Sequence, residues 1–221
     1  MKQRTFSTEL GFVLGHLLLA FSSTCMAKAN FGLSMVVAPA YLLHLKIGIS
    51  FGTAEYCMQA ALLLLMLLIL RRFKLTYLLS FFTAVVYGVV LDTFMIIVDL
   101  PDLSMPARIA LFMVGLLSGP AGLSLLFKSY LTPLVYELFV RETSRKFCVP
   151  LGRFKSYFDL TLCAFGIALS FAFFGFGHFE GIKIGTVICA LVNGRLVGLY
   201  SKALDKKFIF KDSRPWREHF A

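Results

Sequence analysis

Six apolar stretches, each long enough to cross a lipid bilayer, dominate this sequence of 221 residues. An apolar helix needs about 20 residues to cross a hydrocarbon core of about 30 Å. The predicted spans run from Thr8 to Ala27, Ser50 to Leu70, Leu75 to Ile97, Arg108 to Phe127, Ser156 to Phe176 and Ile182 to Tyr200. Hydrophobic residues make up 58% of the chain, whereas roughly half is usual in soluble domains. The sequence therefore predicts an all-α membrane protein with one transmembrane domain over residues 1–221.

The basic residues lie mainly on one side of these spans. Most of the 22 Lys and Arg residues precede the first span, follow the second, fourth and sixth, or lie in the tail over residues 201–221. The positive-inside rule therefore predicts that both termini and this basic tail are cytoplasmic. The same rule accounts for the net charge of +10, so we expect no nucleic-acid partner. The expected partners are the lipid bilayer and a small-molecule substrate, and a homodimer is an assembly that the sequence leaves open.

The beginning of the chain has features of a signal peptide. It has a basic front, an apolar middle and small residues at Ala27 and Ala29 that resemble a cleavage site. A retained first helix is the preferred interpretation, because the apolar stretch is long enough to span the membrane.

We find no pattern typical of an enzyme or a metal centre. The five cysteines are scattered, with no CxxC pair. No His/Glu metal spacing, nucleophile elbow or phosphate-binding loop occurs. We therefore expect no cofactor, no metal ion and no enzymatic activity.

Two shorter apolar segments lie between spans. The stretch from Asn30 to Lys46 contains Pro39, and the stretch from Tyr130 to Lys146 contains Pro133. Both are too short to cross the membrane, and Pro39 is expected to interrupt a helix within its segment. Each segment is predicted to form a short broken or interfacial helix after the first span of its half.

The two halves of the chain match each other. Gly15 matches Gly115 at an offset of 100 positions, and the third and sixth spans match at an offset of 106. Repeat 1 covers about residues 8–98 and repeat 2 about residues 107–200. Because each half has three spans, the second half must be inverted, as in many secondary transporters. Chance alignment of apolar sequence is the alternative. The matching residues at helical spacing are Ser80, Ala84, Gly88 and Asp92 in the third span and Thr186, Ala190, Gly194 and Gly198 in the sixth.

Arg195 is the most conspicuous charge, because it lies inside the sixth span. An arginine there costs at least ~2.5 to 3.5 kcal/mol on insertion scales, so a partner or water is expected beside it. Asp92 on the third span is the expected partner. The pair either fixes the contact between the two helices, or forms a midplane substrate site in which Arg195, with Asn193 nearby, binds a carboxylate or phosphate and Asp92 binds a cation or proton. Asn30, beside the first short segment, either donates to the substrate or caps the following helix.

Glu55 and Asp159 occupy matching places early in the second and fifth spans. Acidic residues near helix N-termini are favoured by the helix dipole alone. The functional alternative makes Glu55, Asp159 and Asp92 gating or ion-coupling groups.

The runs KANFGLSMVVAPAYLL and IGTVICALVNGRLVGLYSK, together with the repeated three-span plan, resemble the YitT/YczE-like family of bacterial multipass membrane proteins. The resemblance covers about Gly11 to Lys202. It implies an inner-membrane location and a candidate transport function without a settled substrate. Arg195 departs from the family pattern, which favours a small or apolar residue there, so no family role extends to it.

A secondary transporter of a small polar or anionic organic solute is therefore the leading functional hypothesis, with a midplane site between the third and sixth spans. The first alternative is a substrate-binding membrane subunit of an ATP-driven importer. The second is a membrane assembly or scaffold protein that does not transport.

Overall fold

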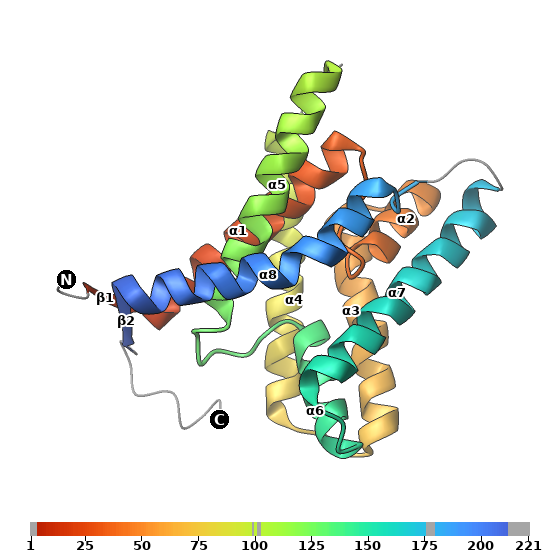
Figure 1. Cartoon of the computed structure of the whole chain (residues 1–221). Coiled ribbons are helices and arrows are strands. Elements are labelled where there is room, and N and C mark those ends of the chain that lie inside the picture. Colours follow the sequence, from red (N-terminus) through yellow and green to blue (C-terminus); the bar gives the residue numbers. More distant parts are fainter. Residues whose placement is uncertain (1–3, 99, 101–102, 176–179, 212–221) are drawn as a thin grey trace.

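The computed structural model describes residues 4–98, 100, 103–175 and 180–211, and these form an α-helical membrane protein (Figure 1). Six helices are long and apolar enough to cross a membrane, and they agree closely with the predicted spans. These are α1 (Thr8–Ala29), α3 (Phe51–Leu70), α4 (Leu75–Ile97), α5 (Met105–Leu126), α7 (Leu151–Phe174) and α8 (Ile184–Lys207). The end of the predicted fifth span at Phe176 lies outside the described residues.

The centre of the molecule is the crossing of α1 and α5, which glycine residues bring close together. A Cβ atom on Gly15 would lie 2.9 Å from the carbonyl oxygen of Gly122, and a Cβ on Gly122 would lie 2.7 Å from that of Gly15. Ser22 donates a hydrogen bond of 2.6 Å to the carbonyl oxygen of Gly115. Because small residues let helix backbones approach, this crossing is the most extensive helix contact in the described residues.

Each of the two short segments forms a helix that packs beside the C-terminal part of a spanning helix. Helix α2 (Ala38–Ile47) packs against α7, and α6 (Val135–Lys146) packs against α3. The expectation that Pro39 interrupts a helix is wrong. Pro39 lies in the first turn of α2, where a missing N–H costs nothing, and Pro133 precedes α6.

Several contacts are those that an inverted repeat predicts. Under the offset of 100, Gly15 corresponds to Gly115 and Ser22 corresponds to Gly122. The contact between Gly15 and Gly122 therefore corresponds to the contact between Gly115 and Ser22. Near the ends of α2 and α6, two lysines likewise donate to carbonyl oxygens near the end of the second spanning helix of the opposite half. Lys46 Nζ donates to the Phe173 oxygen at 3.1 Å, and Lys146 Nζ donates to the Ile69 oxygen.

The halves differ in their last two helices. Helix α3 packs closely on α4, whereas α7 and α8 do not form such a packed pair. Helix α8 packs instead on α5, and most of its surface is exposed. The inverted repeat therefore remains a prediction that these matching contacts support.

Two short strands join the ends of the chain. Strand β1 (Arg4–Ser7) pairs in parallel with β2 (Phe208–Lys211), with Arg4 opposite Phe208. Phe6 packs edge-on against the rings of Phe208 and Phe210. The start of the predicted basic tail, from residue 201, belongs to α8, which continues to Lys207, and to β2, which follows it. Residues 212–221 lie outside the described part. We call the side of the bundle that carries β1 and β2 the strand side.

Candidate functional site

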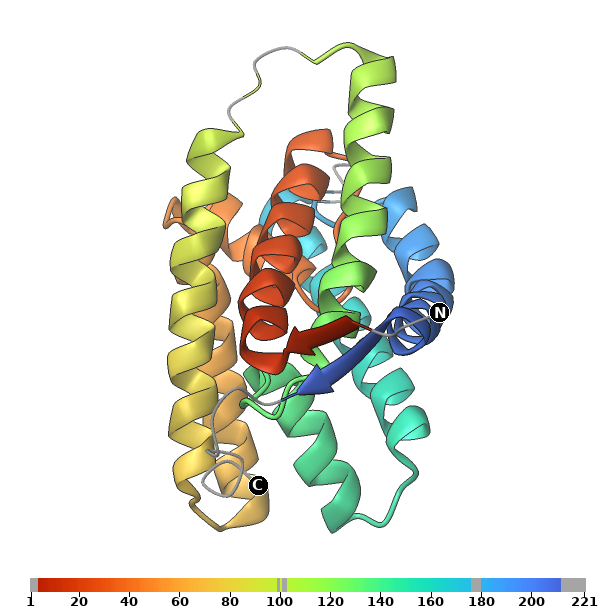
Figure 2. The ribbon, with the colours of Figure 1, turned by 90° about the vertical axis from the view of Figure 1, so that its left-hand side faces the viewer.

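The expected site between the third and sixth spans does not form. Figure 2 shows α4 (yellow) and α8 (blue) at opposite sides of the molecule, with α1 and α5 between them. Asp92 accepts hydrogen bonds of 2.6 Å from Ser50 Oγ and from the Gly52 N–H. It therefore holds the start of α3 rather than a ligand. Arg195 is exposed on α8 and forms no ion pair within the described residues.

The other predicted site residues are dispersed. Asn193 is half-buried on α8, and its Oδ1 has no hydrogen-bond partner in the part of the chain that the structure describes. Asp159 lies 3.4 Å from Lys155 one turn earlier on α7. Asn30 ends α1 in the left-handed conformation, with φ of 57°, and accepts a hydrogen bond of 2.7 Å from Lys183. Of the six predicted residues, only Glu55 lies in a fully buried polar environment.

Glu55 is 1% exposed in the interior of the bundle. Its Oε1 accepts a hydrogen bond of 3.3 Å from Gln59 Nε2, one turn further along α3. The Gln59 side-chain oxygen in turn accepts a bond of 3.0 Å from the Val135 N–H at the start of α6. Gln59 thus links the carboxyl group to the N-terminus of the short helix, whose first N–H groups have no partner within α6.

More polar groups surround this carboxyl group. Tyr136 follows Val135, is 4% exposed, and interacts through its hydroxyl with Glu55. This hydroxyl forms no hydrogen bond of regular geometry in the described residues. Tyr87 from α4 lies close by and shares a hydrogen bond of 3.1 Å with Ser23 of α1. The second oxygen of Glu55, Oε2, also lacks a partner in the described residues. Since buried polar groups are nearly always paired, the polar cluster of Glu55, Gln59, Tyr87 and Tyr136 is a candidate ligand site.

A cavity of about 420 Å³ lies on the strand side, and one of its lining residues, Glu137, directly follows Tyr136 of the cluster. It lies between the end of α5, the α5–α6 loop, α6 and the start of α7. Three charged residues line it, namely Glu137, Arg141 and Lys155. The other lining residues are Leu126, Phe127, Ser129, Tyr130, Leu131, Pro133, Val140 and Leu151. We call this space the strand-side cavity.

The charged groups of the strand-side cavity are incompletely paired. Glu137 Oε2 and Arg141 Nε are buried atoms without a hydrogen-bond partner in the described residues. Lys155 forms an ion pair with Asp159, in which Nζ lies 3.4 Å from Oδ1. A cavity with apolar walls and a few convergent polar groups is the usual form of a small-molecule site, and its volume lies within the typical range of about 300 to 1,000 Å³.

Burial raises the pKa of the Glu137 carboxyl group above its usual range, and the charge of Lys155 opposes this shift without cancelling it. The stability that neutral Glu137 contributes is therefore present below the ordinary glutamate pKa of about 4.3 and is lost as pH rises through the raised pKa. We expect the apparent melting temperature of the protein in detergent to fall over this window. A Glu137→Gln variant, which cannot ionise, should show a smaller fall.

Glu142 provides a control with the opposite sign. Burial alone would raise its pKa, but Lys74 at 3.1 Å and the Tyr77 hydroxyl lower it below the usual range. A Glu142→Gln variant should lose stability mainly at neutral pH, where the carboxylate is ionised. If the apparent melting temperatures of Glu137→Gln and Glu142→Gln depended on pH in the same way, the opposite pKa shifts of Glu137 and Glu142 would be contradicted.

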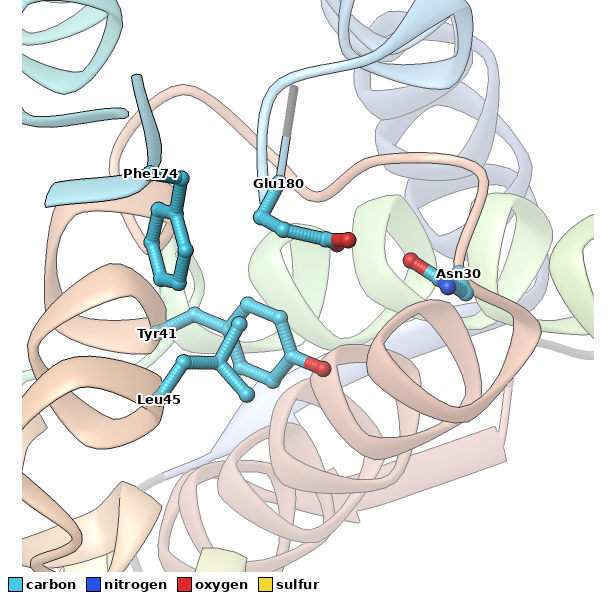
Figure 3. Close-up of a pocket in the computed structure, with 5 residues that line it drawn as sticks. All are labelled: Asn30, Tyr41, Leu45, Phe174 and Glu180. Atoms are coloured by element: carbon cyan, nitrogen blue, oxygen red, sulfur yellow. The ribbon is translucent and has the colours of Figure 1, made fainter. Parts of the chain in front are cut away.

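The opposite side of the bundle has its own pocket of about 450 Å³ (Figure 3). Tyr41 and Leu45 of α2 and Phe174 of α7 form its apolar part, and Glu180 points toward Asn30. Lys183 joins these two polar residues, with bonds of 3.0 Å to Glu180 and 2.7 Å to Asn30. Because its carboxylate is already paired, this pocket has less unpaired polar chemistry than the strand-side cavity.

A family model matches residues 6–202, which include every residue of the polar cluster and both pockets. The chain belongs to the family of unknown function DUF6198. No curated protein and no solved structure matches this DUF6198 chain. The function of the DUF6198 protein must therefore be inferred from the chemistry of its own residues.

Sequence reasoning did not single out Gln59, Tyr136, Glu137 or Arg141. A signal for Gln59 existed, because it stands one helical turn after Glu55 in an otherwise apolar span. Glu137 and Arg141 have the same spacing on α6. Glu137 and Arg141 were not predicted as site residues, because α6 lies outside the predicted spans and charged residues are common in such segments.

Proposed function

We propose that this membrane protein is a secondary transporter of a small polar or anionic organic solute, which binds in the strand-side cavity. The observation that carries the proposal is that Glu137 and Arg141 both line a ligand-sized cavity while each keeps a buried side-chain atom, Oε2 and Nε, without a hydrogen-bond partner in the described residues. This site replaces the midplane site around Arg195.

The residues of the cavity favour an anionic group on the solute. Arg141 presents a guanidinium, which binds carboxylate or phosphate through two parallel hydrogen bonds. Lys155 adds a second positive charge at the start of α7. Because its raised pKa favours the neutral acid, Glu137 can donate a hydrogen bond without repelling the anion. The leucine, valine and phenylalanine side chains suit an apolar portion of the same molecule.

The short helix α6 supports a transport role. It starts beside Gln59, in the middle of α3, and its last residue reaches the end of that helix at Ile69. Irregular backbone at this depth is tolerated where it is buried in protein or lines a cavity. Half-helices with this position commonly form the substrate site of secondary transporters. Under the positive-inside rule, the strand side is the cytoplasmic side of a bacterial inner membrane.

A binding screen tests this proposal. Purified protein is heated with pooled small carboxylates and phosphate esters, and a ligand of the native state raises the apparent melting temperature. The shift should disappear in Arg141→Gln. It should persist in Arg145→Gln, which removes a solvent-exposed arginine from the same helix. An equal shift in both variants would place the anion elsewhere.

A subunit of an ATP-driven importer is the second candidate, and the surface of α8 favours it. Among the described residues, no atom of another element lies within 4 Å of a Cβ built on Gly194 or Gly198, so this stripe of small residues is open to another helix. Co-purification with an ATPase from the native membrane would support this candidate. Solute uptake by the isolated protein in liposomes would exclude it.

A further inference from the structure

Glu55 has an unusual environment for an acidic residue. It is 1% exposed, it accepts one hydrogen bond, and its Oε2 has no partner in the described residues. No lysine or arginine forms an ion pair with it in the described part of the chain. An ionised carboxylate without a counter-charge is very costly in such an interior, whereas the neutral acid is tolerated.

The orientation of Gln59 disfavours a metal cation as the missing partner. Its oxygen is occupied by the Val135 N–H, so its NH₂ group must face Glu55. An N–H donor directed at the carboxyl group repels a cation. Hard metal cations also require about six oxygen ligands, and the described residues contain no group of three acidic, histidine or cysteine side chains that could bind a metal ion.

The ionisable groups that face Glu55 form a route to the strand-side cavity. Tyr87 of α4 and Tyr136 of α6 lie beside it, and Glu137 is within electrostatic range. Glu137 in turn faces Lys155 and Asp159 of α7 and lines the cavity together with Arg141. Glu55 itself is sealed from solvent, so Glu137 connects it to the strand side.

We propose that Glu55 is the proton-binding site that couples a proton gradient to solute movement, and that it exchanges its proton with Glu137. This inference rests on the proposed transport function and names its coupling ion. In the exchange, neutral Glu137 gives one proton to a Glu55 carboxylate that has released its own, so Glu55 returns to the neutral form that its surroundings tolerate. Glu137 then takes up a new proton from the strand side. Neutral Glu137 then stands beside Arg141 in the state that favours anion binding.

Infrared difference spectroscopy tests the proton site without any solute. Purified protein in lipid is titrated from acidic to alkaline pH, and the carbonyl stretch of protonated carboxylic acids is followed. Two bands from buried acids are expected to disappear as pH rises. Glu55→Gln should lack one of them and Glu137→Gln the other, whereas Glu142→Gln should keep both because Glu142 is paired with Lys74.

Two results would overturn the proposal. The first is an unchanged spectrum in Glu55→Gln. The second is a spectrum that responds to NaCl but not to choline chloride at constant pH, which would indicate a sodium site. If Glu55→Gln does not fold, Tyr136→Phe serves instead, because removal of the adjacent hydroxyl should shift the Glu55 band. A negative binding screen would leave these spectra unaffected, so failure of the solute proposal and failure of the proton proposal can be distinguished.

Discussion

A Gly52→Val variant is expected to lose the folded, monodisperse state. Gly52 lies in the first turn of α3, against Gly88 of α4, and a Cβ on Gly52 would overlap the Gly88 carbonyl oxygen. It would also lie 2.7 Å from Asp92 Oδ2, in the network that holds the start of α3. Overpacking of an ordinary core costs about 1–3 kcal/mol, and backbone atoms cannot move aside as a side chain can. We expect a larger loss here, measured as aggregation in size-exclusion chromatography.

Gly194→Val is the matched control for this substitution. Gly194 lies at the position of α8 that matches Gly88, but a Cβ there meets no atom of another element within 4 Å in the part of the chain that the structure describes. The variant should elute and melt like the wild type. Equal damage from both substitutions would mean that α8 packs against a partner as closely as α4 packs against α3.

A Gln59→Leu variant is expected to detach α6 from α3. Leucine removes the acceptor of the Val135 N–H and the donor to Glu55 at once. Each buried group left unpaired costs about 1–3 kcal/mol, so two such groups remove a large part of the stability of a typical domain, about 5–15 kcal/mol. Limited proteolysis of the loop before α6 should become faster, and the apparent melting temperature should fall.

Met58→Leu is the control, because it changes the adjacent position without altering a polar group. It should leave both measurements close to the wild type. If Gln59→Leu is as resistant to proteolysis as Met58→Leu, the amide does not hold α6 in place.

The sequence was sufficient to predict the six spans, because the length and hydrophobicity of each run reflect the thickness of the bilayer. Pairing between helices was harder to predict. A stripe of small residues indicates that a helix can be approached closely, but not by which partner. The stripe of α4 contacts α3 at Gly52 and Gly88, whereas that of α8 is open at Gly194. This difference is why Asp92 and Arg195 do not meet.

The candidate site was predicted only at Glu55. Its buried neighbours come from α6, a short helix in which charged residues look like an ordinary polar face. Only the fold reveals that the start of α6 is inserted beside the middle of α3. The strand pair was also missed, since each strand has four residues and its partner lies at the other end of the chain.

Solute counterflow in proteoliposomes is the most direct test of whether this cavity carries solute across the membrane. The protein is reconstituted alone, loaded with a compound from the binding screen, and supplied with the labelled compound outside. We predict saturable uptake that Arg141→Gln abolishes and Arg145→Gln retains. Binding without any flux in the protein reconstituted alone would contradict the transporter account.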